Sequence, residues 1–166
     1  MTHLAPPPTR RAKGGQTRFS FGATSAIITN LALITSLDTM AHAKLSIIGS
    51  IAVIALADNI SDSFGIHIYQ ESEGIDKKEI WFSTLDNFFA RVFVSLTFVL
   101  LVVALPMGLA VVSSVVWGMA LLAVISFTIA RSRGVDPFSA IAEHVGIAVV
   151  VITAGHFVGR WIIGRF

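Results

Sequence analysis

Long apolar stretches separated by short polar segments dominate the chain. Residues 92–130 form one nearly continuous apolar run, and Pro106 and Gly108 interrupt it, so we predict a tight hairpin there. Counting that run as two, five stretches approach the roughly 20 residues that a helix needs to cross about 30 Å of hydrocarbon. They cover about 18–38, 45–71, 88–105, 109–130 and 139–163. The pattern predicts an all-α integral membrane protein with five transmembrane helices.

The polar segments predict the organisation of the chain. Residues 1–17 are rich in Pro, Gly and Arg, which is typical of a flexible tail. A single membrane domain should follow over 18–166, with a loop at 72–87 between the second and third spans. The second span is too long for a perpendicular crossing and should tilt or project past the membrane. Ala41-His42-Ala43 resembles a signal-peptide cleavage site, but the hydroxyl and amide residues of the first span favour a retained helix.

Composition agrees with a membrane class. The chain is 54% hydrophobic and 13% charged, with a mean hydropathy of +0.78, more apolar surface than a soluble domain of 166 residues could bury. The basic residues are scattered at span ends, so we expect no nucleic-acid partner. The absence of cysteine excludes disulfides and thiolate sites. We find no H-E-x-x-H, G-x-S-x-G or phosphate-binding glycine loop, and therefore do not expect an enzyme.

Lysine and arginine positions predict the orientation. If the N-terminus is cytoplasmic, three basic residues fall outside, namely Lys44, Arg160 and Arg165. Nine then fall on the cytoplasmic side: Arg10, Arg11, Lys13, Arg18, Lys77, Lys78, Arg91, Arg131 and Arg133. This positive-inside bias predicts a cytoplasmic N-terminus and an outside C-terminus. The expected location is the plasma (inner) membrane of a prokaryote.

Two aspartates, Asp58 and Asp62, stand inside the second span. Each carboxylate near the bilayer centre costs about 2.5–3.5 kcal/mol on insertion scales. A helix turns about 100° per residue, so the two lie one turn apart on the same side. A stripe at every fourth position runs beside them: Asn59, Ser63, His67 and Glu71. The opposite face is apolar and can meet lipid: Val53, Ile60, Phe64 and Ile68.

These groups match a cation or proton pathway. Carboxylate and amide oxygens together with imidazole suit a borderline divalent metal such as Fe²⁺ or Mn²⁺, and the carboxylates could also carry protons. The candidate pathway residues are Asp58, Asp62, Asn59, Ser63, His67 and Ser25. Two alternatives stay open. The aspartates could instead hydrogen-bond neighbouring helices and hold the bundle together, and Ser25 could serve helix packing.

Further candidates lie nearer the span ends. Glu71, Glu73 and Glu143 could form a cytoplasmic approach for cations, although solvated interfacial carboxylates would look the same. Gly155 and Gly159 form a G-x-x-x-G pattern, which predicts either close helix packing or a dimerisation surface.

Four segments of the chain resemble the vacuolar iron transporter family. They are FGATSAIITNLALITSLD (Phe21–Asp38), IGSIAVIALADNISDSFGIHIYQESEG (Ile48–Gly74), TFVLLVVALPMG (Thr97–Gly108) and GHFVGRWIIGRF (Gly155–Phe166). The resemblance implies a homodimer that moves Fe²⁺ or Mn²⁺ out of the cytoplasm in exchange for protons, with no permanently bound cofactor. Ser25 stands where the family usually has an aspartate, and Asp58 stands near the acidic position of its second helix. The family's long cytoplasmic metal-binding insert is reduced here to residues 71–91.

Overall fold

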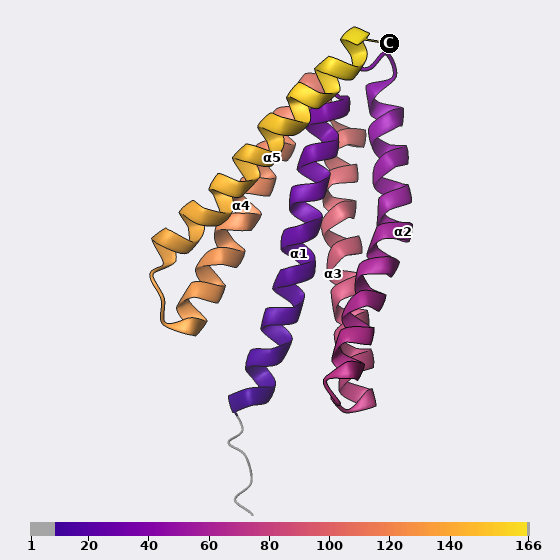
Figure 1. Cartoon of the computed structure of the whole chain (residues 1–166). Coiled ribbons are helices and arrows are strands. Elements are labelled where there is room, and N and C mark those ends of the chain that lie inside the picture. Colours follow the sequence, from indigo (N-terminus) through magenta and orange to yellow (C-terminus); the bar gives the residue numbers. More distant parts are fainter. Residues whose placement is uncertain (1–8, 166) are drawn as a thin grey trace, which may run out of the picture.

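The computed structural model describes the backbone of residues 9–165 and the side chains of residues 20–165. These residues form five helices, each long and apolar enough to cross a membrane, which confirms the predicted fold class. Their bounds are α1 Thr9–Leu37, α2 Ala43–Ser72, α3 Lys77–Ala104, α4 Met107–Arg133 and α5 Pro137–Arg165. The helices run alternately up and down, so α1 begins at one end of the bundle and α5 finishes at the other (Figure 1).

Local sequence signals account for the turns. Leu105 is extended and Pro106 caps α4, as expected for a residue pair that cannot continue a helix, so the predicted hairpin is confirmed. Gly134 closes α4 with φ 70°, a left-handed conformation that costs glycine little. The Asp136 carboxylate then accepts hydrogen bonds from the backbone N–H of Phe138 and Ser139, which satisfies the free donors at the start of α5.

Two predicted boundaries are wrong. The third helix begins at Lys77 and not near residue 88, because the Asp76 carboxylate accepts from the Lys78 N–H and caps it. The expected loop at 72–87 is therefore only a short turn after Ser72. The expected tail at 1–17 is helical from Thr9 onward, and residues 1–8 lie outside the described residues.

Among the described helices, α2 is the longest by a small margin. With 30 residues, α2 is about 45 Å long, against about 30 Å of hydrocarbon. The α2–α3 turn reaches well beyond the α4–α5 turn at the same end of the bundle (Figure 1). Helices α1 and α3, which contact α2, extend about as far at that end (Figure 1), so the choice between tilt and projection stays a prediction.

Helix α1 lies at the centre and contacts α3, α4 and α5, and α2 to a lesser extent. Its Ile27, Leu31 and Ile34 are fully buried, and Phe98 and Val102 of α3 pack with them. Large apolar side chains on the outside of the other helices remain exposed, as expected where lipid covers them. Val53, Ile60, Phe64 and Ile68 belong to this outer set, which agrees with the predicted lipid face of α2.

The G-x-x-x-G pattern packs within the chain. A Cβ atom added at Gly155 would lie 2.7 Å from the Ser36 Oγ, and one at Gly159 would lie 2.1 Å from the Ser36 carbonyl oxygen. Both glycines therefore allow α5 to approach the end of α1 closely. Of the two predicted uses of this pattern, close helix packing is the one that the fold shows.

Candidate functional site

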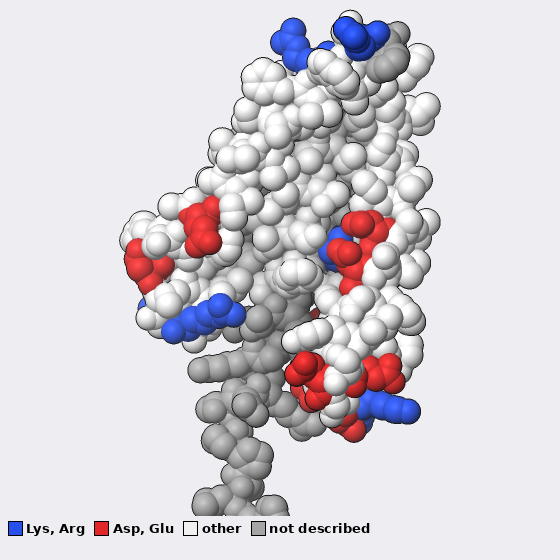
Figure 2. All heavy atoms as spheres, in the orientation of Figure 1, with Lys and Arg blue, Asp and Glu red and all other residues white. Residues whose placement is uncertain are grey.

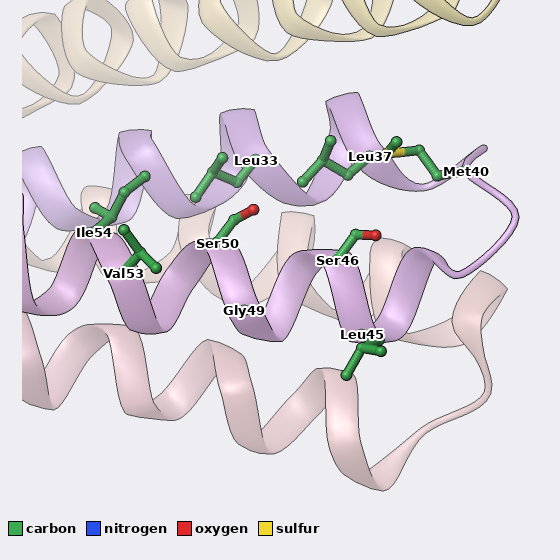
Figure 3. Close-up of a pocket in the computed structure, with 9 residues that line it drawn as sticks. All are labelled: Leu33, Leu37, Met40, Leu45, Ser46, Gly49, Ser50, Val53 and Ile54. Atoms are coloured by element: carbon green, nitrogen blue, oxygen red, sulfur yellow. The ribbon is translucent and has the colours of Figure 1, made fainter.

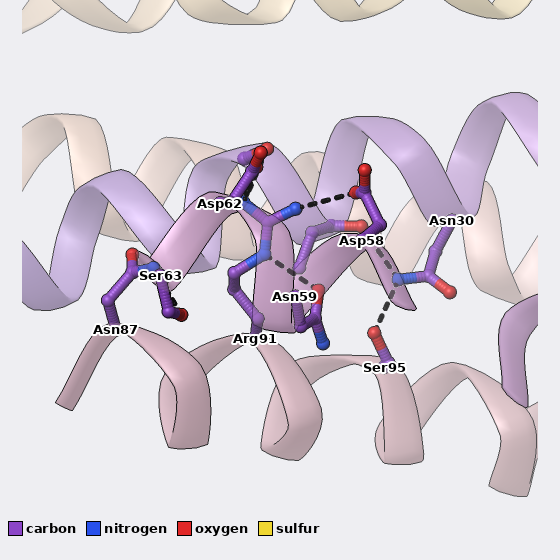
Figure 4. Close-up of polar contacts among 10 residues, drawn as sticks. Asn30, Asp58, Asn59, Asp62, Ser63, Asn87, Arg91 and Ser95 are labelled. Carbon is purple, nitrogen blue, oxygen red and sulfur yellow. Dashed lines mark hydrogen bonds and ion pairs between the residues drawn. The ribbon is translucent and has the colours of Figure 1, made fainter. Parts of the chain in front are cut away.

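A buried arginine holds the two membrane aspartates. Arg91 of α3 is 1% exposed, and its Nη2 lies 2.9 Å from Asp58 Oδ2 while its Nη1 lies 2.6 Å from Asp62 Oδ2. The Nε donates to Asn59 Oδ1 at 2.7 Å, and Nη1 also donates to Ser25 Oγ at 3.1 Å (Figure 4). Because the guanidinium has five N–H donors, this set occupies most of them. We call Arg91, Asp58 and Asp62 the charged centre.

The position of Arg91 corrects the sequence interpretation. The positive-inside pattern places Arg91 among nine cytoplasmic basic residues, yet it lies about 20 Å along α3 from the α3–α4 turn, at 1.5 Å per residue. A lone arginine at that depth would be costly, and paired carboxylates on an adjacent helix remove most of that cost. Eight basic residues against three still give the same predicted orientation.

The charged centre is not electrically balanced. Two carboxylates face one guanidinium, so one negative charge is uncompensated. The Asp58 and Asp62 side chains are 48% and 42% exposed, and only their Oδ2 atoms contact Arg91. Figure 2 shows acidic and basic side chains together on this face, part-way along α2 and away from the charged ends of the bundle. The two Oδ1 atoms are therefore free to meet another cationic group or a proton.

A polar seam continues from the charged centre along α2 and α3. Its side-chain contacts are Ser63 with Asn87 at 3.0 Å, His67 with Thr84 at 3.0 Å and Gln70 with Ser83 at 2.9 Å. Asn59 Nδ2, Asn87 Oδ1 and Gln70 Oε1 are buried along the seam and have no hydrogen-bond partner among the described residues. Buried polar atoms of this kind usually take ordered water, so the seam is chemically suited to hydration.

Gly22 of α1 makes room for this arrangement. A Cβ atom there would lie 2.5 Å from Asn87 Oδ1, 2.9 Å from the Asn87 carbonyl oxygen and 3.2 Å from Arg91 Cγ. The absence of a side chain lets α1 approach α3 where Arg91 crosses between them. On the other side of the centre, Asn30 of α1 donates to Ser95 of α3 at 2.9 Å.

We expect Gly22→Ala to lower the stability of the protein by about 1–3 kcal/mol, the usual cost of overpacking. The methyl group would push against a backbone carbonyl, which cannot rotate away. The measurement is SDS-induced unfolding followed by circular dichroism. Gly49→Ala is the control, because a Cβ atom there meets nothing within 4 Å. Equal unfolding midpoints for both variants would contradict this account of Gly22.

An open groove lies between α1 and α2, and its lining residue Ile54 stands one helical turn before Asp58. It encloses about 630 Å³, and side chains of both helices point into it (Figure 3). Its lining is apolar except for two serines and comprises Leu33, Leu37, Met40, Leu45, Ser46, Gly49, Ser50, Val53 and Ile54. The charged centre and the groove thus lie next to each other along α2.

The predicted pathway residues fall into two groups. Ser25, Asp58, Asn59 and Asp62 surround Arg91, whereas Ser63 and His67 face α3 farther along the seam. The two aspartates were predicted to share a side of α2, and they do. The six do not form a shared cation cage, because the oxygens of Asn59 and Ser25 bind the arginine. Within residues 20–165, no three His, Asp or Glu side chains form a group that could hold a metal ion.

The three glutamates predicted to form a cytoplasmic approach for cations do not all lie together. Glu71 lies beside His67 in a small cavity at the α2–α3 end, and Glu73 caps the C-terminus of α2. Glu143 is exposed on α5, which packs on α1 and α4 and stands on the other side of α1 from the α2–α3 turn (Figure 1). It is not part of a common approach with Glu71 and Glu73.

Arg91 is the residue that sequence reasoning missed. A signal for it was present, because polar residues recur at every fourth position from the predicted loop into the third span: Ser83, Asn87, Arg91 and Ser95. All four are buried, and they match the stripe that begins at Asn59 on α2. Pairing the two stripes would have placed Arg91 inside the bundle, whereas the register that sets it opposite the aspartates comes only from the structure.

Comparisons with known proteins return nothing that could narrow the function. No family model matches the chain, and no curated protein and no solved structure matches it significantly. What is established about this chain is therefore its class, a multi-pass membrane protein with five helices.

Proposed function

We propose that the protein is a homodimeric transporter that exports a divalent cation, Fe²⁺ or Mn²⁺, from the cytoplasm in exchange for protons. The observation that carries this proposal is the charge of the centre. One buried Arg91 faces two half-exposed carboxylates, which leaves one negative charge and two free carboxylate oxygens at membrane depth. Intramembrane ionisable groups that are not fully paired are typical of ion and proton pathways.

The exposure of the charged centre supports a homodimer, in which a second copy of the chain covers it. Asp58 and Asp62 are about half exposed, and lipid contact would be costly for a charged group at that position. A dimer with its two-fold axis along the membrane normal would bring equal depths of two copies together. Two charged centres would then face each other across the interface, and each would be shielded from lipid.

Charge arithmetic then favours a divalent ion exchanged for protons. Two centres together carry two uncompensated negative charges. One divalent cation or two protons would neutralise them, so the exchange of one for the other would leave the membrane interior neutral in both states. The Oδ1 atoms of the aspartates would be the ligands, while Arg91 would hold the Oδ2 atoms in place. Carboxylate oxygens are suitable ligands for Mn²⁺ and acceptable ones for Fe²⁺.

We also propose that the chain is a short, divergent relative of the vacuolar iron transporter family. The motifs quoted above support this relationship, as do the five spans and the overlong second helix. The excess of basic residues at the α2–α3 and α4–α5 end supports a cytoplasmic location of that end.

The test is cation flux into proteoliposomes that contain the purified protein, with Fe²⁺, Mn²⁺, Co²⁺ and Zn²⁺, each with and without a pH gradient. We expect flux that follows the gradient and is lost in Asp58→Asn and in Asp62→Asn. Each single change leaves one carboxylate for Arg91, so the centre becomes neutral and the fold should be retained. The unfolding midpoint of each variant checks this directly.

Asp86→Asn is the matched control. It is the same chemical change at an exposed carboxylate of α3 outside the charged centre, and we expect it to leave flux unchanged. Normal flux in Asp62→Asn would contradict a transport role for the centre. Loss of flux that is accompanied by loss of folding would be assigned to structure and not to transport.

A second candidate is a membrane scaffold or an accessory subunit without transport activity. It is favoured by one specific observation, that Arg91 neutralises much of the carboxylate charge and binds Asn59 and Ser25 as well. In this case the charged centre would hold α2 and α3 in register, and its exposed side would contact a partner protein. Well-folded protein without flux for any of the four metals would favour this candidate.

A further inference from the structure

A small cavity near the α2–α3 turn brings an imidazole and a carboxylate together. His67 and Glu71 stand one helical turn apart on α2 and line a space of about 120 Å³. The remaining lining residues are Lys77, Ile80 and Trp81 of α3. Within the described residues Glu71 has no ion pair or hydrogen bond through its carboxylate. The charged centre lies farther along the same seam.

The hydrogen bonds determine which nitrogen of His67 carries the proton. Thr84 donates its hydroxyl proton to the Ile80 carbonyl at 2.9 Å. Because a hydroxyl has only one proton, the 3.0 Å contact between Thr84 Oγ1 and His67 Nδ1 must use an N–H of the histidine. In the neutral ring, Nε2 therefore carries the free lone pair, and it has no hydrogen-bond partner among the described residues.

Aromatic neighbours hold the ring in this orientation. Phe64 stacks on His67 with ring centroids 5.7 Å apart and nearly parallel planes. Trp81 meets the imidazole edge-on, with centroids 4.7 Å apart. Together with the bond to Thr84, these contacts restrict rotation of the ring, so that a ligand at Nε2 would meet a preorganised nitrogen.

We propose that His67 Nε2 and the Glu71 carboxylate form a loading site for a divalent transition-metal ion, with water completing its coordination. An imidazole with a carboxylate suits Fe²⁺, Mn²⁺, Co²⁺ or Zn²⁺. Metal-binding histidines almost always donate their other ring N–H to a protein acceptor, which fixes the tautomer, and Thr84 is that acceptor here. That this ion is then carried to the charged centre rests on the proposed function, whereas the binding itself does not.

Lys77 gives the site a counteracting charge. Its side chain lines the same cavity, so its ammonium group would repel a bound cation. Two protein ligands beside a lysine make a weak and rapidly exchanging site, which is what loading requires. We expect Lys77→Gln to tighten metal binding several-fold, opposite in direction to every ligand substitution.

The experiment measures Mn²⁺ binding to the purified full chain in detergent by electron paramagnetic resonance, in the Asp62→Asn background. The charged centre is neutral in that background, so binding reports on the cavity alone. We expect bound Mn²⁺ to show coupling to one imidazole nitrogen. His67→Gln and Glu71→Gln should each remove that signal or weaken binding about tenfold or more, and Thr84→Val should weaken it about tenfold through loss of the acceptor.

Two controls separate ligation from structure. Thr84→Ser keeps the hydroxyl and should bind like the parent. His144 resembles His67 in one respect, since its Nδ1 lies 2.7 Å from Ser126 Oγ and Ser126 also bonds to the Leu122 carbonyl. However, Ala140 and Ala148 occupy the positions one turn before and after it, so His144→Gln should leave binding unchanged.

The outcomes also separate this proposal from the proposed function. Unaltered binding in His67→Gln, or bound Mn²⁺ without nitrogen coupling, would overturn the loading site even if the wild type transports metal. If binding depends on His67 but the wild-type protein shows no flux, the loading site is supported and only the proposed transport function is contradicted.

Discussion

Arg91→Met is expected to lower the free energy of unfolding by about 3 kcal/mol, the lower end of the range for breaking a buried ion pair. The substitution leaves two carboxylates at membrane depth without a counter-charge. We choose the lower end because Asp58 and Asp62 are half exposed. SDS-induced unfolding followed by circular dichroism would measure the loss.

Compensating variants make this first prediction specific. Arg91→Met combined with Asp58→Asn and Asp62→Asn removes all three charges and should recover most of the stability, because a neutral replacement of a buried ion pair is usually tolerated. Arg133→Met, at an exposed arginine of α4, should have almost no effect. Stability of Arg91→Met equal to that of the wild type would mean that the charged centre does not hold α2 against α3.

Gly159→Ala is expected to lower the stability by about 1–3 kcal/mol, and Gly159→Leu by more. The added methyl group would lie 2.1 Å from the Ser36 carbonyl oxygen and 3.0 Å from its Cα atom. Both belong to the backbone at the end of α1, so α5 as a whole would have to move. The measurement is the same unfolding titration.

Two further glycines of α5 provide comparisons for this second prediction, because an alanine at each should have a smaller or an opposite effect. At Gly155 the nearest atom is the Ser36 Oγ at 2.7 Å, which can rotate away, so Gly155→Ala should cost less. At Gly146 an added Cβ atom meets nothing within 4 Å, and Gly146→Ala should stabilise the helix by up to about 1 kcal/mol. A Gly159→Ala protein that unfolds normally but changes its oligomeric state would instead indicate a dimer contact.

The lengths of the apolar runs and the residues at the turns were sufficient to predict the fold class. Five stretches near the length of a membrane span became five helices, and Pro106 ended α3 where the sequence indicated. The errors lie where polar residues enter a helix. Residues 77–87 are too polar for a lipid-facing span, but they are helical because Asp76 caps them and α2 packs alongside.

The candidate site was predictable only in part. Helical periodicity placed Asp58 and Asp62 on one side of α2, and the structure agrees. Whether the six pathway residues conduct a cation or a proton stays a prediction, because a ligand set depends on what stands opposite each residue. The sequence offers Asn59 and Ser25 as candidate oxygen ligands for a cation, yet their oxygens accept hydrogen bonds from Arg91.

The sequence by itself determined the class of this protein, because the hydrocarbon layer sets the length of a span and backbone hydrogen bonding requires it to be helical. It also determined which residues of α2 share a face, because the helical repeat is local. Only the tertiary structure decided that Arg91 belongs with the aspartates, since 29 residues separate it from Asp62 and their contact depends on the register of α2 against α3. The same packing decided that Gly155 and Gly159 serve the fold of one chain, because α1 and α5 meet only when the bundle closes.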